Sequence, residues 1–236
     1  MPSLTVPLAL VTGTSSGIGL AIAQRLLAQG WQVHGLDILP AQDLGPLFTS
    51  SKVDLTQADA LQIVLTDVLA KGTPLALIHA AGVLRVGSLG TLSSADGQLM
   101  WQLHVEAATQ LANHVLPLMH QAKRGRMVMV GSRVSTGIAG RSQYAASKAA
   151  LVSLARSWAA ESIAHGVTVN VVSPAATDTP MLQDPARANT TPKLPPIGRL
   201  IQADEVAALV EYLLSQQAAA ITGQDIAICG GASVQR

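Results

Sequence analysis

Short apolar runs alternate with helical repeats from one end of the chain to the other. The runs indicate buried strands at residues 8–11, 33–36, 75–78, 127–130, 167–172 and 225–228, with a weaker one at 52–53. Between them, apolar side chains recur at helical spacing, at residues 20–30, 61–69, 95–122, 142–164 and 205–214. Strands that alternate with helices need crossover connections. The pattern therefore predicts a doubly wound α/β fold, in which a parallel sheet of about seven strands has helices on both faces.

Two segments depart from this regular alternation. Pro117 lies inside the repeat at 95–122 and predicts a kink near the end of that helix. Four prolines between residues 184 and 198 predict a surface loop rather than a hinge between domains. No change in composition marks a second domain, so we expect residues 1–236 to form one domain.

Composition and charge exclude several classes of protein. Hydrophobic residues make up 49% of the chain and charged residues 12%, so there is ample apolar surface to bury and disorder is excluded as the main state. A formal net charge of +1 offers no general attraction for nucleic acid or an anionic membrane. We expect neither a transmembrane span nor a signal peptide, because no long apolar stretch is uninterrupted and residues 1–24 lack a basic start. One cysteine, Cys229, excludes an internal disulfide framework and a cysteine-based zinc cluster, and it fits a reducing compartment such as the cytoplasm.

A glycine-rich turn joins the first predicted strand to the first helix. It reads Thr12-Gly13-Thr14-Ser15-Ser16-Gly17-Ile18-Gly19. Its glycines permit a tight turn and a close approach of the backbone to a ligand. The helix that starts here directs free N–H groups and its positive dipole end toward an anion, and a pyrophosphate suits that site. Three glycines also fit an ordinary strand–helix turn, but the strand before them, the helix after them and an acid after the second strand favour a dinucleotide.

That acid is Asp37, 18 residues after Gly19. An aspartate in this place can accept hydrogen bonds from both ribose hydroxyls of adenosine, and it repels a 2′-phosphate. Because no arginine or lysine lies between residues 12 and 19, the sequence favours NAD over NADP. A solvated turn aspartate is the plainer alternative. Asp54 follows the weak third strand and is equally compatible with capping the next helix and with contacting the adenine amino group.

With these motifs the chain resembles the short-chain dehydrogenase/reductase family, in its small single-domain form. Tyr144-Ala145-Ala146-Ser147-Lys148 matches the family's Tyr-x-x-x-Lys motif, and Ser132 precedes Tyr144 by 12 residues, as the family's serine does. Residues 173–181, 221–224 and 230–231 are similar to its later segments. The resemblance covers nearly the whole chain. It implies a Rossmann-type fold, an oxidoreductase that uses a nicotinamide cofactor without a metal, and a homodimer or homotetramer.

The resemblance also implies which residues contact the cofactor and the substrate. Residues 180–200, which contain the prolines, would form a lid over the substrate. The predicted cofactor contacts are Gly13, Ser15, Ser16, Gly17, Ile18, Gly19, Asp37, Asp54, Leu55, Ala80, Ala81, Gly82, Tyr144, Lys148, Pro174, Thr177 and Thr179.

Tyr144 and Lys148 form a chemically reasonable pair on physical grounds. Positions four apart share one face of a helix. An ammonium near a phenol favours the phenolate, so the pKa of Tyr144 is expected to fall from about 10 toward the working pH. Tyr144 would then serve as the acid or base for an alcohol and its carbonyl partner, while Ser132 orients the substrate oxygen. By the family resemblance, Lys148 also binds the nicotinamide ribose.

Two histidines stand where the family has asparagine. The segment after the fourth strand reads His79-Ala80-Ala81-Gly82, so the hydrogen bonds of the family's asparagine must be replaced. In the long central helix, His104 takes the place of an asparagine that holds a proton-relay water. His104 could hold a water or move a proton near neutral pH, and a histidine satisfied by helix packing is an equal alternative. Ala175, where the family often has glycine, is a milder departure.

Three arginines lie in loops at the carboxyl ends of the predicted strands. Arg85, Arg133 and Arg141 could clamp a substrate carboxylate, or they could form salt bridges and subunit contacts. The segments around Arg85 and residues 172–179 are similar to the subfamily that oxidises a dihydroxy-cyclohexadiene carboxylate. A small cyclic alcohol that bears a carboxylate is therefore the expected substrate class. The alternatives are a 3-oxoacyl-thioester reductase that uses NADPH, and a non-catalytic nucleotide-sensing protein on the same fold.

Overall fold

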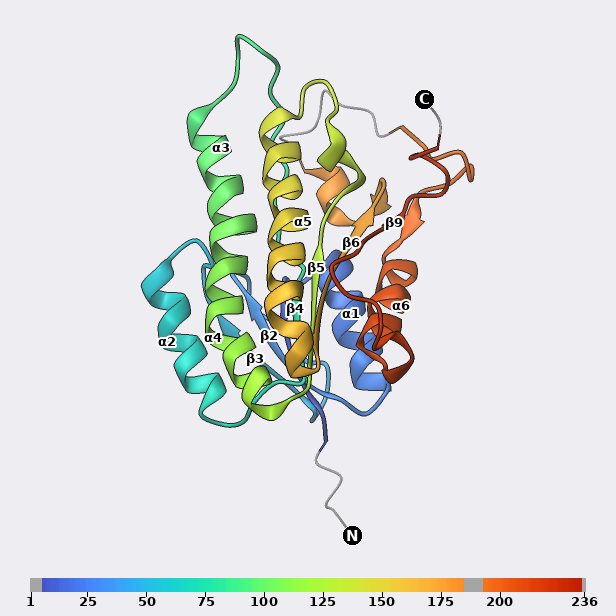
Figure 1. Ribbon diagram of the computed structural model, residues 1–236. Coiled ribbons are helices and arrows are strands. Elements are labelled where there is room, and N and C mark those ends of the chain that lie inside the picture. Colours follow the sequence, from blue (N-terminus) through green and yellow to red (C-terminus); the bar gives the residue numbers. More distant parts are fainter. Residues whose placement is uncertain (1–5, 185–192, 235–236) are drawn as a thin grey trace.

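The computed structural model describes residues 6–184 and 193–234. Within this part of the chain, seven strands form one sheet in the order β3-β2-β1-β4-β5-β6-β9, and every pairing is parallel (Figure 1). The strands are β1 (Leu8–Thr12), β2 (Gln32–Asp37), β3 (Phe48–Lys52), β4 (Ala76–His79), β5 (Gly125–Val130), β6 (Val167–Pro174) and β9 (Asp225–Ile228). The predicted doubly wound α/β fold is confirmed.

Helices form a layer on each face of this sheet. α2, α4 and α5 pack on one face, and α1 and α6 pack on the other (Figure 1). None of the described helices has the combination of length and apolar character that crossing a membrane requires. Their bounds are α1 (Gly17–Ala28), α2 (Ala58–Leu69), α3 (Ser94–Trp101), α4 (Ala107–Ala122), α5 (Ser142–Ser162) and α6 (Ala203–Leu214).

The central strands are apolar throughout because both of their faces are covered. Neighbouring strand residues point to opposite faces of a sheet. Leu10, Leu77 and Met127 pack toward α2, α4 and α5, whereas Val11 and Ile78 pack toward α1 and α6. All five side chains are fully buried, and each such burial stabilises the fold by roughly 1.5–3 kcal/mol. Two cores therefore fix the sheet from both sides.

The third strand lies earlier in the sequence than the prediction at 52–53. β3 spans Phe48–Lys52 and pairs with β2 at the edge of the sheet. Its side chains are mostly polar, and the ring nitrogens of His34 hydrogen-bond to the hydroxyls of Thr49 (2.8 Å) and Ser51 (3.0 Å). Apolar periodicity does not reveal such a strand, because polar partners on its neighbour replace hydrophobic packing.

The long helical repeat at 95–122 is interrupted at residues 102–106, and the kink predicted at Pro117 stays a prediction. A π-helical turn, η1 (Gln102–Glu106), separates α3 from α4, while Pro117 lies inside α4. A π turn widens the helix by one residue and is frequent at functional sites. His104 lies in the middle of this turn, beside the end of β4 and the start of α5.

Two short strands add a second, smaller sheet after β6. β7 (Thr177–Asp178) pairs in parallel with β8 (Ile201–Gln202). The predicted lid leaves from β7 through a 3₁₀ turn, η4 (Pro180–Gln183), and returns into β8. Of that lid, residues 185–192 lie outside the described part of the chain.

Candidate active site

A cavity of about 670 Å³ lies at the carboxyl ends of the strands, where the strand order reverses between β1 and β4. Open parallel sheets bind their ligands at such a reversal. All the predicted cofactor contacts except Ser15 line this cavity, and so do Ser132, Arg85, Arg133 and Arg141. Of the predicted site residues, Ser15 and His104 lie outside its walls.

The glycine turn presents bare backbone to the cavity at the start of α1. Gly13 and Gly17 have φ values of +77° and +56°, which residues with a side chain rarely adopt. A Cβ on Gly13 would lie 2.9 Å from the Ala81 backbone nitrogen, and one on Gly19 would lie 2.1 Å from the Gly13 carbonyl oxygen. The turn, the helix start and the β4 loop thus form a cradle without side chains. This cradle and the free N–H groups of α1 fit a diphosphate.

Asp37 ends β2 and braces the glycine turn. Its Oδ2 accepts the Ser15 N–H at 2.9 Å and its Oδ1 accepts the Leu39 N–H at 3.0 Å. The carboxylate also lines the cavity, and each of its oxygens can accept a further hydrogen bond. Ser15 therefore reaches the site indirectly, because its N–H positions Asp37.

Asp54 holds the turn before α2 and does not cap that helix. Its Oδ1 accepts hydrogen bonds from the Thr56 N–H (2.9 Å) and the Thr56 hydroxyl (2.8 Å). The N-cap residue of α2 is Gln57. Because Asp54 also lines the cavity, contact with an adenine remains open to it, whereas the capping alternative does not hold.

Three side chains with acid–base chemistry meet in the cavity. Ser132 ends β5, and its Oγ accepts the Val134 N–H at 3.2 Å, which leaves its own hydroxyl hydrogen for another partner. Tyr144 and Lys148 lie one turn apart on α5, and the Lys148 Nζ is 5.9 Å from the centre of the Tyr144 ring. All three side chains are at least 93% buried, so their electrostatic interactions with neighbouring groups are stronger than they would be in water.

Lys148 is anchored at the cavity floor. Its Nζ donates to the Val130 carbonyl oxygen at 2.8 Å. Burial lowers the pKa of Lys148 to about 7, because the ammonium has lost its hydration. In the protein by itself, Lys148 therefore changes charge near neutral pH.

His104 lies behind the cavity. It is fully buried, and both of its ring nitrogens have hydrogen-bond partners in the protein. Its ring meets that of Tyr144 edge to face, with 5.6 Å between the ring centres. The proton-relay role predicted for His104 stays a prediction, and this geometry resembles the packing alternative.

The three arginines differ in their surroundings. Arg85 forms an ion pair with Asp184 at 3.0 Å, and its Nε lies 3.9 Å from an oxygen of Asp96. Arg133 donates to the Ala232 carbonyl oxygen at 3.4 Å. Within residues 6–184 and 193–234, no carboxylate forms an ion pair with Arg133 or Arg141. Arg85 therefore takes the salt-bridge alternative, whereas Arg133 and Arg141 line the cavity without such a pair in the described part of the chain.

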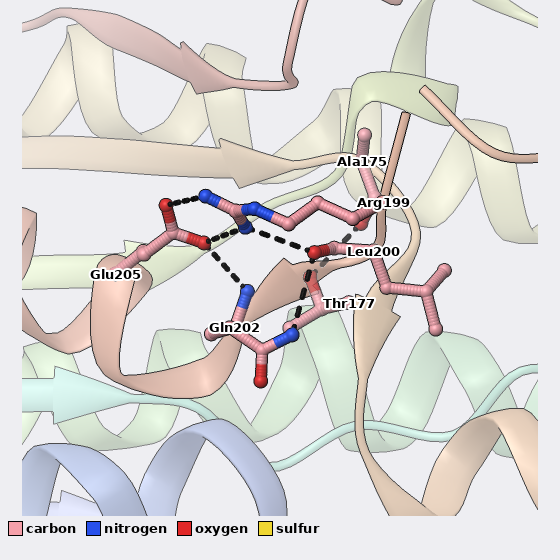
Figure 2. Close-up of polar contacts among 6 residues, drawn as sticks. All are labelled: Ala175, Thr177, Arg199, Leu200, Gln202 and Glu205. Carbon is pink, nitrogen blue, oxygen red and sulfur yellow. Dashed lines mark hydrogen bonds and ion pairs between the residues drawn. The ribbon is translucent and has the colours of Figure 1, made fainter. Parts of the chain in front are cut away.

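The segment after β6 is held in place by β7 and β8. Thr177 in β7 lines the cavity, and its hydroxyl donates to the Ala175 carbonyl oxygen at 3.0 Å (Figure 2). The Ile201 N–H of β8 donates to the Ala176 carbonyl oxygen at 3.0 Å. The chain that returns from the predicted lid is thus tied to the cavity wall.

A cluster of polar contacts anchors this return at the start of α6. The Arg199 guanidinium forms two hydrogen bonds with the Glu205 carboxylate, at 2.7 and 2.9 Å (Figure 2). Glu205 also accepts the Gln202 N–H at 2.8 Å, in a capping box. The arginine and the capping bond lower the pKa of Glu205 to about 2.

Sequence reasoning missed the apolar wall around Tyr144. Leu84, Val134, Ile138 and Met181 line the cavity and pack with Tyr144 in one cluster. They come from separate segments, and no motif unites them. Lys193 also lines the cavity and adds a cation that the sequence analysis did not single out.

A parallel sheet with a cavity where its strand order reverses is the architecture of a dinucleotide-binding protein, and Ser132, Tyr144 and Lys148 line that cavity. A family model described as enoyl-(acyl carrier protein) reductase matches residues 13–233. The chain belongs to the short-chain dehydrogenase/reductase family, as predicted, and is an NAD(P)-dependent oxidoreductase of that family.

Relatives of known activity match over nearly their whole length. The chain is 34% identical to the 3-oxoacyl-[acyl-carrier-protein] reductase of Salmonella typhimurium, over 95% of this chain and 96% of that protein. It is 35% identical to the 2,3-dihydro-2,3-dihydroxybenzoate dehydrogenase of Escherichia coli, with the same coverage. Actinorhodin polyketide ketoreductase, solved with NADPH, superimposes with a TM-score of 0.90 and 26% identity over the full length of both chains.

Proposed function

We propose that the protein transfers a hydride between NAD(H) and a secondary alcohol or its carbonyl partner, with Ser132, Tyr144 and Lys148 as its catalytic residues. One observation carries this proposal. These three side chains line the same cavity as the bare backbone of the glycine turn. A reacting carbon and a dinucleotide can therefore meet there.

The residues of the chain have separate tasks in the proposed reaction. In alcohol oxidation, Tyr144 as phenolate takes the hydroxyl proton of the substrate, and the carbon–hydrogen electron pair leaves with the hydride. The bound nicotinamide supplies the acceptor for that hydride. The Ser132 hydroxyl donates a hydrogen bond to the substrate oxygen, where charge develops. Lys148 stabilises the phenolate while it is an ammonium, and its remaining N–H groups can bind the ribose.

Replacing the Tyr144 hydroxyl tests the proposed chemistry. Tyr144→Phe should lower kcat for a cyclic secondary alcohol by about 100- to 10,000-fold, the usual contribution of a general acid–base. Binding of NADH should persist. Tyr212→Phe, on the exposed surface of α6, is the matched control and should keep full activity. Equal kcat values for Tyr144→Phe and the wild type would contradict the proposal.

NAD is the proposed cofactor because of the charges along the cavity. Asp37 lies at the end where the adenosine ribose would bind. The basic residues that line the described cavity are Arg85, Arg133, Arg141, Lys148 and Lys193, which belong to other segments. A 2′-phosphate would therefore meet a carboxylate without a compensating cation. The ratio of kcat/KM for NAD to that for NADP measures this preference.

A carboxylate on the substrate would match those cations of the cavity wall that form no ion pair with a described carboxylate. We propose Arg133 and Arg141 as its partners. Arg85 could also bind the carboxylate if the substrate replaced Asp184 in its ion pair. Each arginine changed to alanine should raise KM for a carboxylated cyclic alcohol more than KM for an uncharged one. Arg124→Ala, an exposed residue before β5, is the control. Equal effects on both substrates would exclude the clamp.

A 3-oxoacyl-thioester reductase is the second candidate, because a relative with 34% identity carries that name. The same assay discriminates between the two. Two rates are compared: reduction of a 3-oxoacyl thioester with NADPH, and oxidation of the cyclic carboxylated alcohol with NAD. A faster reduction would favour this candidate. Binding of NADH without turnover of any substrate would favour a sensing role and contradict both.

Three further features are part of the proposal. A homodimer or homotetramer fits the sparse charge of the chain, and a cytoplasmic location fits its single cysteine. The lid at 180–200 fits the described flanks, in which Met181, Leu182, Lys193 and Pro195 line the cavity. Light scattering tests the oligomeric state, and limited proteolysis with and without NADH tests the lid.

A further inference from the structure

Two fully buried histidines flank the cavity floor, and neither is a residue of the proposed acid–base step. His79 ends β4, and His104 lies in the π turn η1. Their four ring nitrogens all have partners among the described residues. Those partners are specific enough to assign where each ring carries its proton.

His79 links β1 to the π turn. Its Nε2 lies 3.1 Å from the Leu103 carbonyl oxygen, and because a carbonyl only accepts, Nε2 carries the hydrogen. Its Nδ1 then accepts the Thr12 hydroxyl at 3.0 Å. The Thr12 Oγ1 in turn accepts the N–H groups of Ala80 and Ala81, each at 3.0 Å. The cavity loop after β4 is thus fixed through His79.

His104 links the same loop to α5 with the opposite arrangement. The Val83 N–H donates to its Nε2 at 3.1 Å, so the hydrogen is on Nδ1. Nδ1 donates to the Ser147 Oγ at 2.9 Å. The Ser147 hydroxyl donates to the Tyr144 carbonyl oxygen at 2.9 Å. The π turn is therefore joined to the residue that carries the phenol.

The surroundings of both rings favour the neutral form. Burial and the neighbouring Lys148 lower the pKa of His79 to about 3 and the pKa of His104 well below its usual value. A second ring proton on His104 would face the Val83 N–H, and one on His79 would face a Thr12 oxygen that already accepts two hydrogens. Protonation thus breaks a hydrogen bond at either ring.

We propose that His79 and His104 are neutral positioning residues of opposite tautomer that hold the π turn between the β4 loop and α5 and so place Tyr144 and Lys148. Neither moves a catalytic proton. The effect on turnover rests on the proposed function, whereas the tautomer assignment does not. A wrong tautomer assignment and a wrong proposed function would therefore show up in different measurements.

Nitrogen-15 NMR of the histidine rings tests the assignment directly. Long-range correlations distinguish a ring with its hydrogen on Nε2, a ring with it on Nδ1, and an imidazolium. We expect His79 to carry its hydrogen on Nε2 and His104 on Nδ1, with both unchanged from pH 8 to about pH 5. Each resonance is assigned by its loss in the single glutamine variant. An imidazolium at neutral pH, or the same tautomer in both rings, would overturn the proposal.

Kinetics of amide variants test the positioning role. Glutamine reaches the place of Nε2, and asparagine reaches only the place of Nδ1. His79→Gln can still donate to Leu103, and His104→Gln can still accept from Val83. The asparagine variants instead keep only the contacts made by Nδ1, with Thr12 or Ser147. Either amide breaks one link of the chain from the β4 loop through the π turn to α5, so we expect each variant to lose about 10- to 100-fold in kcat, with KM and the pH limbs unchanged.

Two results would count against positioning. The first is a limb of the pH–rate profile that disappears in His104→Gln, which would indicate a proton carried by that ring. The second is a wild-type kcat in both the glutamine and the asparagine variant of either histidine. Thermal melting of every variant separates a loss of folding from a loss of alignment.

Discussion

Arg85 Nη1 and Asp184 Oδ2 lie 3.0 Å apart, although 99 residues separate them in the chain. Both side chains are about three-quarters buried. The ion pair joins the loop after β4 to the start of the predicted lid. Arg85 is one of the three arginines that the sequence predicted as partners for a substrate carboxylate, and here it is already paired with Asp184.

Removing the charge of Asp184 should release Arg85 for an anionic substrate. We expect Asp184→Asn to lower KM for a carboxylated cyclic alcohol by about fivefold, because a partly buried ion pair should contribute about 1 kcal/mol, the upper end of the range for exposed pairs. KM for an uncharged alcohol should not fall. Asp67→Asn, on the exposed side of α2, is the control. A KM that rises for both substrates would show that the pair supports the site and does not compete with substrate.

The charge of Asp37 should set the cofactor preference. Asp37→Asn keeps an oxygen that can accept from the glycine turn and removes the repulsion toward a 2′-phosphate. We expect the ratio of kcat/KM for NAD to that for NADP to fall by about 10- to 100-fold, the range of a hydrogen bond to a charged group. Asp43→Asn in the following loop should leave the ratio unchanged. An unaltered ratio in Asp37→Asn would mean that adenosine does not bind there.

Gly19 should not tolerate a methyl group. Its Cβ would lie 2.1 Å from the Gly13 carbonyl oxygen, so backbone has to shift. We expect Gly19→Ala to lower the free energy of unfolding by about 1–3 kcal/mol and to abolish stabilisation by NADH in thermal melts. Gly97→Ala in α3 meets the Gln143 side chain, whose displacement costs one exposed hydrogen bond to Ser93, and it should keep stabilisation by NADH. Wild-type NADH stabilisation in Gly19→Ala would argue against a tight backbone cradle.

Acid should destabilise the protein through its buried histidines. The folded pKa of His79 is about 3, below the value of about 6.5 for an unfolded histidine, so the unfolded chain binds more protons between these values. Its stabilising contribution is complete above pH 6.5 and is lost progressively as the pH falls toward 3. The free energy of unfolding should decrease by up to about 1.4 kcal/mol per pH unit for this group.

Urea denaturation at a series of pH values measures that slope. His79→Gln should reduce the slope between pH 6 and pH 4, although the variant itself starts from a lower stability. His114→Gln, at a partly exposed position on α4, is the control and should leave it unchanged. His34, whose pKa burial lowers to about 4, supplies a second acid-sensitive group with the same sign. Identical slopes for wild type and His79→Gln would mean that His79 is not buried in its neutral form.

Local pattern determined the layers of this protein and the chemistry that it offers. Runs such as Leu75–Ile78 are apolar because both faces of the sheet are covered, and that requirement can be read from neighbouring residues alone. The glycine turn, Asp37 and the spacing of Tyr144 to Lys148 are also local, because one turn or one helix face sets each of them. The fold class and the family therefore follow from the sequence.

Tertiary structure decided which side chains pair with one another. Arg85 meets Asp184, and His79 meets Thr12 and Leu103, only because the crossovers bring the carboxyl ends of the strands together. The π turn at 102–106 and the polar strand β3 leave no hydrophobic signature, since distant hydrogen-bond partners stabilise them. Periodicity records which face of an element is buried, whereas a contact between separate segments depends on how all the elements pack.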